Sequence, residues 1–352
     1  MKGIRLFRTN AARWACTIFS GILLVACGGG GSSSSSSGSG PVKIAWSVWT
    51  GWMPFKLIDK EGLLEKRAKE LGVNVELVEF KGYMESVQAF SAGQVDACAM
   101  TSMEALQPAS TGVQTVAVLV NDISNGGDGV LVRTGMTVDD LKGKDILLEQ
   151  FSVSHYVLSR LLERHGIADN EVTIKNTPGD DAGKAFLADD TVQAVATWNP
   201  HLFLAKESNK GEILFDSSSI PGEIIDLLVF NGKTLASDPK VAEAIVLAWY
   251  DAMALITGAD TRDAAIKTMA EGAGAEVEEF ERMLEGTILY TDAAKGVELF
   301  KSPDLPETMN RIRDFSFKNE LITDKDFEIG YGADSSSLMR FNPTFMEGVA
   351  GN

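Results

Sequence analysis

Apolar segments alternate with polar or Gly-containing breaks along residues 42–120 and predict strands and helices in alternating order. Segments rich in β-branched residues at 42–48, 73–80 and 115–120, and an apolar run at 95–100, predict strands. The intervening segments 54–71 and 84–92 predict helices, and Pro54 and Gly72 suit the start and the end of the first one. This alternation predicts a parallel sheet with helices on both faces.

A second, similar series follows the Gly-rich segment at 126–129. It predicts strands at 130–133, 146–149, 172–175 and 192–198 and helices at 153–165 and 182–188. A strand at 224–230 is expected to return from this series, and helices are expected at 239–257, 262–271, 277–284 and 306–319. The predicted fold class is therefore α/β with two lobes, each a sheet flanked by helices. Lobe 1 is expected to comprise 41–125 plus 229–352 and lobe 2 126–228, with hinge crossings near 122–129 and 224–231.

The first forty residues have a different pattern. Four basic residues precede an apolar run at 14–26, which is shorter than the roughly 20 residues that span a bilayer, so 1–26 is expected to be a signal peptide. Leu24-Val25-Ala26-Cys27 resembles a bacterial lipobox, and Gly and Ser alone occupy 28–40. Lipidation of Cys27 and a flexible tether over 27–40 are expected, which would anchor the protein in the periplasm or at the cell surface through lipid only. Ordinary cleavage and release is the alternative.

Composition excludes several functions. The 352 residues include 32 Lys and Arg against 49 Asp and Glu, a formal charge of -17, which disfavours nucleic acid as a partner. Three His and three Cys provide little material for a metal site, so no metal and no cofactor are expected. The loop at 179–185 lacks the spacing of a phosphate-binding loop, and no nucleophile elbow occurs. A catalytic role is therefore not expected, although an enzyme acting on a small nitrogen compound, or an adhesive surface protein, would be the alternative classes.

Ligands of open parallel sheets bind beyond the carboxyl ends of the strands. Five segments occupy such positions: 49–52, 101–104, 121–128, 149–155 and 197–201. They contain the acids Glu104, Asp122, Asp128 and Glu149 but no Lys or Arg. Such segments suit a cation better than an anion.

The strings Trp49-Thr50-Gly51-Trp52-Met53-Pro54, Ser124-Asn125-Gly126-Gly127-Asp128-Gly129, Ser152-Val153-Ser154-His155-Tyr156 and Thr197-Trp198-Asn199-Pro200 add a family resemblance. In order and spacing they resemble the nitrate/taurine/sulfonate class of periplasmic solute-binding proteins of ABC importers. Within this class they are most similar to a branch found beside urea-carboxylase-like enzymes and linked to urea and guanidine. The resemblance implies a type II-like periplasmic-binding-protein fold, a small-molecule ligand, and a permease and an ATPase as partners.

Guanidinium is the expected ligand, because carboxylates can pair with its planar N–H groups and an aromatic ring can stack on its face. Glu104 and Asp122 are expected to hold it, with support from Glu149 or Asp128 and with Trp52 or Trp198 stacked on its plane. Urea, another small amine or amidine, taurine, a sulfonate or nitrate are the alternatives. The complete set of expected ligand-binding residues is Trp49, Trp52, Thr101, Glu104, Asp122, Ser124, Asp128, Glu149, Ser152, Ser154, His155, Trp198 and Asn199.

Several of these residues also have an ordinary structural interpretation. The Asp residues of the Gly-rich crossing can shape turns, and Ser152 and Ser154 can cap a helix. His155 can serve in packing alone. Cys98, within an apolar strand, is expected to be a buried small side chain.

Overall fold

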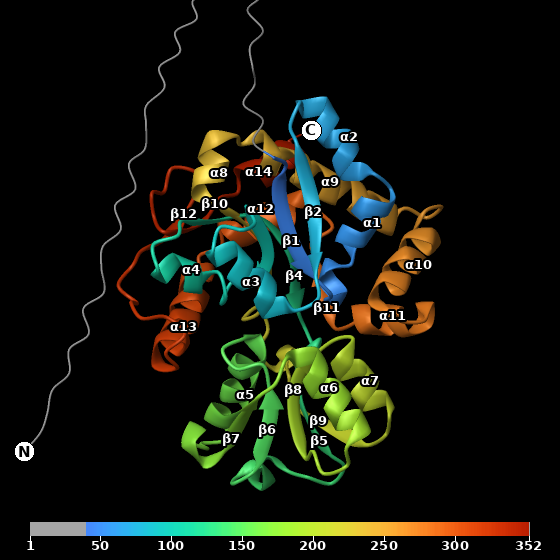
Figure 1. Ribbon diagram of the computed structural model, residues 1–352, viewed down its shortest axis with the longest axis vertical. Coiled ribbons are helices and arrows are strands. Elements are labelled where there is room, and N and C mark those ends of the chain that lie inside the picture. The colour runs from blue at the N-terminus through green and yellow to red at the C-terminus, as the bar shows by residue number, and fades with distance from the viewer. Residues whose placement is uncertain (1–39, 352) are drawn as a thin grey trace, which may run out of the picture. The chain divides into compact units, whose positions relative to one another are not determined.

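The computed structural model of the protein describes residues 40–351 (Figure 1). The expected signal peptide, Cys27 and the tether up to residue 39 lie outside the described residues. Within the described part, no single helix is long and apolar enough to cross a membrane. One pair of helices, Lys240–Thr257 with Arg262–Ala273, reaches the necessary length and composition only when both are taken together, and it is bent by 114°.

The larger of two sheets has the strand order β12-β13-β4-β10-β3-β1-β2, with β11 paired to β4. β1 runs parallel to β2 and β3, whereas β10 runs antiparallel between β3 and β4. The antiparallel direction brings the start of β10 to the edge at which β1 and β3 end. The strands are β1 (Val42–Ser47), β2 (Val75–Phe80), β3 (Ala97–Thr101), β4 (Thr115–Ser124), β10 (Ile225–Asn231), β11 (Thr287–Leu289), β12 (Ile329–Tyr331) and β13 (Met339–Phe341).

The smaller sheet has the order β7-β6-β8-β5-β9. Its strands are β5 (Asp128–Arg133), β6 (Asp145–Leu148), β7 (Thr173–Asn176), β8 (Ala194–Trp198) and β9 (Gly211–Asp216). The chain passes between the sheets at 125–127 and at 217–224. β10 pairs within the large sheet from Ile225 onward, so the second passage ends before β10. The larger lobe therefore resumes a few residues before the expected boundary at 229.

Helices cover both sheets, as the α/β prediction requires (Figure 1). α1 (Pro54–Lys60), α2 (Leu63–Leu71) and α9 (Lys240–Thr257) pack together beside the large sheet, and α3 (Tyr83–Ser91) and α4 (Leu106–Ser110) lie on its other side. α5 (Val153–Arg164) flanks the small sheet opposite α6 (Gly179–Ala188) and α7 (His201–Glu207). The remaining helices are α8 (Gly232–Ser237), α10 (Arg262–Ala273), α11 (Val277–Leu284), α12 (Ala293–Phe300), α13 (Leu305–Lys318) and α14 (Thr344–Ala350).

The helix predicted over 54–71 is two helices. Gly62 has φ of 62°, a left-handed conformation that glycine adopts without steric cost, and it separates α1 from α2. Gly72, with φ of 70°, ends α2 as predicted.

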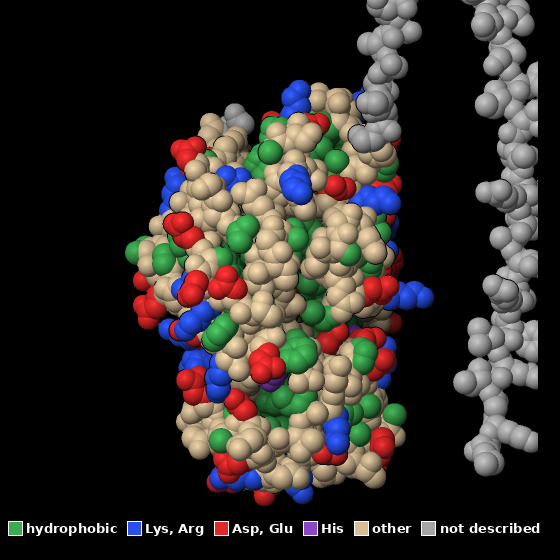
Figure 2. All heavy atoms as spheres, turned by 60° about the vertical axis from the view of Figure 1, so that its left-hand side comes forward, with side chains coloured by type: hydrophobic (Ala, Val, Ile, Leu, Met, Phe, Trp, Pro, Cys, Tyr) green, Lys and Arg blue, Asp and Glu red, His purple; other side chains and the backbone are tan. Residues whose placement is uncertain are grey.

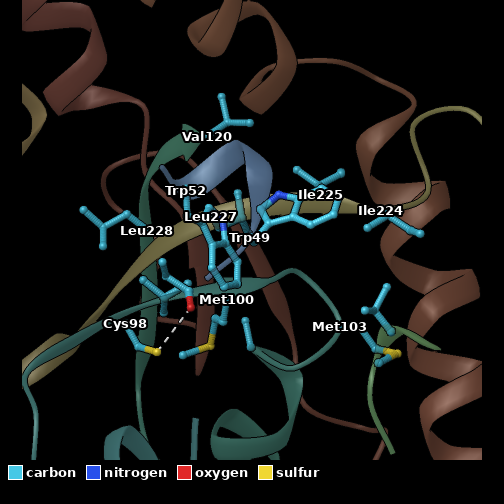
Figure 3. Close-up of a cluster of buried hydrophobic side chains, with 14 of the residues drawn as sticks. Trp49, Trp52, Cys98, Met100, Met103, Val120, Ile224, Ile225, Leu227 and Leu228 are labelled. Carbon is cyan, nitrogen blue, oxygen red and sulfur yellow. Dashed lines mark hydrogen bonds between the residues drawn. The ribbon is translucent and has the colours of Figure 1, made fainter. Parts of the chain in front are cut away.

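The core of the large sheet is apolar and continues to the edge at which the strands end. Figure 3 shows Trp49 and Trp52 among buried side chains of β3 and β10, including Met100 and Leu227. Cys98 is buried in the same cluster, as predicted, and burial raises the pKa of its thiol to about 12. On the face seen in Figure 2, acidic side chains are interspersed with Lys and Arg. Much of the net negative charge is thus dispersed over solvated surface.

Candidate ligand-binding site

A small pocket lies where β1, β3 and β10 of the large sheet meet β5, α5 and β8 of the small one. The empty space between its lining residues is about 300 Å³, part of which is open to solvent. Among residues 40–351, no Lys, Arg or His lines it. The lining residues are Ser47, Val48, Trp49, Trp52, Tyr83, Thr101, Asp128, Val153, Trp198 and Asp226.

Strand pairing brings three polar residues into one row at this edge. Asp226 of β10 pairs directly with Thr101 of β3 on one side and with Asp122 of β4 on the other. Directly paired residues of antiparallel strands have Cβ atoms only about 4.5–5.5 Å apart. Both aspartates are buried, and the indole Nε1 of Trp49 donates to Oδ1 of Asp122 at 3.1 Å. Asp122 therefore lies on the side of Asp226 that is away from Thr101, and it does not line the pocket.

Glu104 is also fully buried, in the turn between β3 and α4. The hydroxyls of Thr101 and Tyr83 donate to its carboxylate, and the backbone N–H of Val153 donates to its Oε1 at 2.9 Å. Val153 is the first residue of α5, so Glu104 joins the large-sheet side to a helix N-terminus of the small-sheet side, where a negative charge is stabilised.

Asp128 begins β5, directly after the first crossing, and completes a cluster of four buried acids with Glu104, Asp122 and Asp226. Desolvation raises the pKa of both Asp122 and Asp128 to about 7. Burial likewise raises the pKa of Glu104, and burial together with repulsion from its three neighbours raises the pKa of Asp226 strongly. Each carboxylate makes ionisation of the others harder, which a bound cation would relieve.

Aromatic rings form the remaining walls. Trp52 packs against Tyr83 with ring centroids 5.4 Å apart, and Tyr83 meets the edge of Trp198 at 6.0 Å. Trp198 ends β8, so this second contact joins the two sheets. The position of Trp198 depends on Gly179 at the start of α6, where a Cβ would lie 2.1 Å from the indole. Gly179 thus allows the helix to approach the ring.

The two crossings are joined to each other by hydroxyl groups. Oγ of Ser124 lies 2.8 Å from Oγ of Ser217, and the backbone N–H of Gly126 donates to Ser217 at 2.6 Å. Ser124 also hydrogen-bonds the carboxylate of Asp128. Ser124 therefore supports the crossing and Asp128 but does not line the pocket.

Glu149 lines a neighbouring pocket that shares Ser47, Val48, Tyr83 and Trp198 with the first. Its Oε2 accepts a long hydrogen bond of 3.4 Å from the backbone N–H of Gly179. Burial raises the pKa of Glu149 to about 7. Glu149 thus stands one pocket away from the four buried acids.

Three of the expected binding residues make contacts elsewhere in the protein instead of lining the pocket. Ser152 is the N-cap of α5 and accepts from the backbone N–H of Ser154 at 3.2 Å. His155 contacts Phe315 of α13, and burial lowers the pKa of its imidazole to about 4. Asn199 accepts from the backbone N–H of Phe203 at 3.1 Å and so supports the start of α7. None of these three side chains, nor Ser154, lines the pocket in the described structure.

Sequence reasoning placed Trp49, Trp52, Thr101, Asp128 and Trp198 at the site, and these residues do line the pocket. It missed Asp226, Tyr83, Ser47, Val48 and Val153. Ser47 and Val48 immediately precede an expected segment and could have been included. Asp226 stands near the start of an antiparallel strand, which the rule of carboxyl strand ends does not select.

The profile of the NMT1-like family matches residues 36–270, about two thirds of the chain. The chain belongs to the NMT1-like family. The matched region of this NMT1-like protein contains the pocket and all four buried acids. A comparison with curated protein sequences found no match.

The NMT1-like chain shares its fold with solved binding proteins. Alkanesulfonate-binding SsuA from Xanthomonas axonopodis pv. citri, bound to MOPS, has TM-score 0.67 and 19% identity, over 82% of this chain and 96% of that one. The aliphatic sulphonate binding protein SsuA from Escherichia coli has TM-score 0.66 and 20% identity, over 82% and 95%. The nitrate-binding protein NrtA from Synechocystis PCC 6803 has TM-score 0.58 and 11% identity, over 89% and 98%. The expected periplasmic-binding-protein fold is thus confirmed.

Proposed function

We propose that this protein is the extracytoplasmic solute-binding subunit of an ABC importer and captures a small nitrogen-rich cation, guanidinium. The fold it shares with sulfonate- and nitrate-binding proteins supports a binding role, and those proteins are named for ligands that they bind. A permease and an ATPase would be its partners. Lipidation at Cys27 would hold it at the membrane, as the lipobox-like string favours.

One observation carries the choice of ligand. Glu104, Asp122, Asp128 and Asp226 are buried together at the pocket, and no basic side chain of the described residues lines it. Buried charges are stable only when they are paired or neutralised. A cation with several N–H donors neutralises the buried carboxylates and also donates hydrogen bonds to their oxygens.

The buried acids at the pocket also disfavour sulfonate and nitrate, the ligands named for the similar solved proteins. Sulfonate and nitrate are anions and require N–H or hydroxyl donors, usually with a basic residue nearby. Here the pocket offers carboxylates at Asp128 and Asp226, which would repel an anion. Urea fits by shape and hydrogen bonding but brings no charge to the four acids, so it is expected to bind more weakly than guanidinium.

The geometry suggests how the cation is held. Asp226 of the large sheet and Asp128 of the small sheet both line the pocket. Trp49, Trp52 and Trp198 surround the same space and offer faces on which a planar cation can stack. Asp122 and Glu104 lie behind this first layer, so their expected direct contact with the ligand becomes long-range support.

Capture would proceed by hinge closure at the two crossings. The ligand would favour the closed state because it touches residues of both sheets, such as Asp226 and Trp198. Two contacts between the sheets, of Glu104 with Val153 and of Tyr83 with Trp198, would further stabilise the closed state.

Indole fluorescence tests the proposal, because three Trp residues line the pocket. Titration with guanidinium at millimolar concentrations is expected to give a saturable change. Urea is expected to bind more weakly, and taurine and nitrate to give no change. Saturation by taurine or nitrate alone would reject the cation. A chemical product formed from any of these compounds would reject binding as the whole function.

A further inference from the structure

Asp122 and Asp226 form a pair of carboxyl groups inside the sheet. They are direct partners across β4 and β10, and their exposed fractions are 0% and 3%. The indole N–H of Trp49 donates to Oδ1 of Asp122 at 3.1 Å, whereas the buried Oδ2 of Asp122 accepts from no donor of the described residues. A carboxylate has no donor of its own, so two neighbouring carboxyl groups can be joined by a hydrogen bond only when one of them carries a proton. An acid–carboxylate pair would therefore satisfy this position.

The surroundings provide no positive charge for this pair. The titratable groups that face it are Asp128 of β5, Glu104 before α4 and Tyr83 at the start of α3. Thr101, on the neighbouring strand β3, is neutral. Within the described part of the chain, no Lys, Arg or His acts on either carboxyl. Two adjacent buried carboxylates in such surroundings cannot both be ionised, so the pair keeps one proton.

One member of the pair meets the ligand. Asp226 lines the pocket, whereas Asp122 does not. A cation that donates N–H groups to Asp226 competes directly with the proton for the same oxygen atoms. It also neutralises the repulsion that keeps the proton in place.

We infer that Asp122 and Asp226 act as a proton-exchange pair, which gives up its shared proton to solvent when a cation enters the pocket and thereby selects cations over neutral solutes. This inference rests on the proposed function. The exchange is balanced, since one positive charge enters as guanidinium and one leaves as H⁺. Urea has no charge to give in exchange, so it binds with the proton retained.

Calorimetry in two buffers of different ionisation enthalpy tests this directly, because the measured heat then reports the protons released per ligand. The measurement is made at pH 8, where Asp122 and Asp128, whose pKa values burial raises to about 7, are ionised. We expect about one proton released for each guanidinium bound and about none for urea.

Asp226→Asn is expected to bind guanidinium more weakly and to release no proton, and Asp122→Asn to reduce the release as well. The matched control is Asp260→Asn at an exposed position, which should release the wild-type number. Guanidinium binding with a heat that does not depend on the buffer would overturn the exchange pair and leave the proposed function standing. Absence of any guanidinium heat from the wild-type protein would overturn both.

Discussion

Asp122 and Asp226 lie opposite each other on the antiparallel strands β4 and β10, buried at the edge where the two sheets meet. Trp49 donates to Asp122, and Asp226 lines the pocket. Acids placed so close together in the interior destabilise the ligand-free protein unless a proton or a cation accompanies them. The stability of the folded protein therefore depends on whether this pair is accompanied by a proton or by a cationic solute.

Replacement of Asp226 by Asn should weaken guanidinium binding. A hydrogen bond to a charged group contributes about 1.5–3 kcal/mol, so the dissociation constant should rise by about 10- to 100-fold. Calorimetry measures the change, with the exposed Asp260→Asn variant as the control. An unchanged dissociation constant would remove Asp226 from the ligand contacts.

Replacement of Glu104 by Gln should separate charge from hydrogen bonding. Gln keeps an oxygen that can accept from the backbone N–H of Val153 but loses the negative charge. We therefore expect the affinity for guanidinium to fall more than the affinity for urea, measured by fluorescence titration of both. Equal losses would show that Glu104 acts only in joining α5 to the large-sheet side. Exposed Glu65→Gln is the matched control.

Gly179→Ala should displace Trp198, because the new Cβ would lie 2.1 Å from the indole ring. Loss of one stacking face should weaken guanidinium binding by about threefold to thirtyfold. Gly348→Ala on α14 is the control, since a Cβ there meets no atom within 4 Å. If Gly179→Ala binds as tightly as the wild type and keeps its indole spectrum, Trp198 is not a wall of the occupied site.

Stability of the ligand-free protein should fall as pH rises from 6.5 to 8. Burial raises the pKa of Asp122, Asp128 and Glu149 to about 7, so the folded state holds protons that the unfolded state has already lost. The stabilisation from this proton binding is complete below the unfolded values near 4 and disappears as pH passes through about 7. His155 and His201, whose pKa values burial lowers, act in the opposite direction mainly below about 6.5.

Thermal unfolding at pH 6.5, 7.2 and 8 measures this dependence. Millimolar guanidinium should restore most of the loss at pH 8, because the cation compensates the ionised acids. Asp122→Asn should show a shallower decline than the wild type. A melting temperature that rises over this pH range would contradict the assignment of raised pKa values to the buried acids.

The sequence predicted much of the fold because its strands are apolar and end in clear breaks. The segment 95–100 corresponds to β3, and 192–198 to β8. Short strands such as β11, with three residues, have no detectable period and were missed. The break at Gly62 was missed as well, because helical residues continue on both sides of it.

The sequence predicted only part of the site, and the missing part has a physical explanation. The rule of carboxyl strand ends selects Thr101 and Trp198, which do line the pocket, but it assumes that strands run in one direction. β10 runs the other way, so Asp226 near its start reaches the same edge. His155 was expected at the site from a local string, yet its side chain packs against α13, a contact that depends on residues 160 positions away.

The central claim is that carboxylates select a cation. Calorimetry of the wild-type protein with guanidinium and taurine, side by side at pH 7, tests it most directly. We expect saturable binding of guanidinium with one site per chain and no heat from taurine, because Asp128 and Asp226 face the ligand. Saturable taurine binding without guanidinium binding would contradict the account.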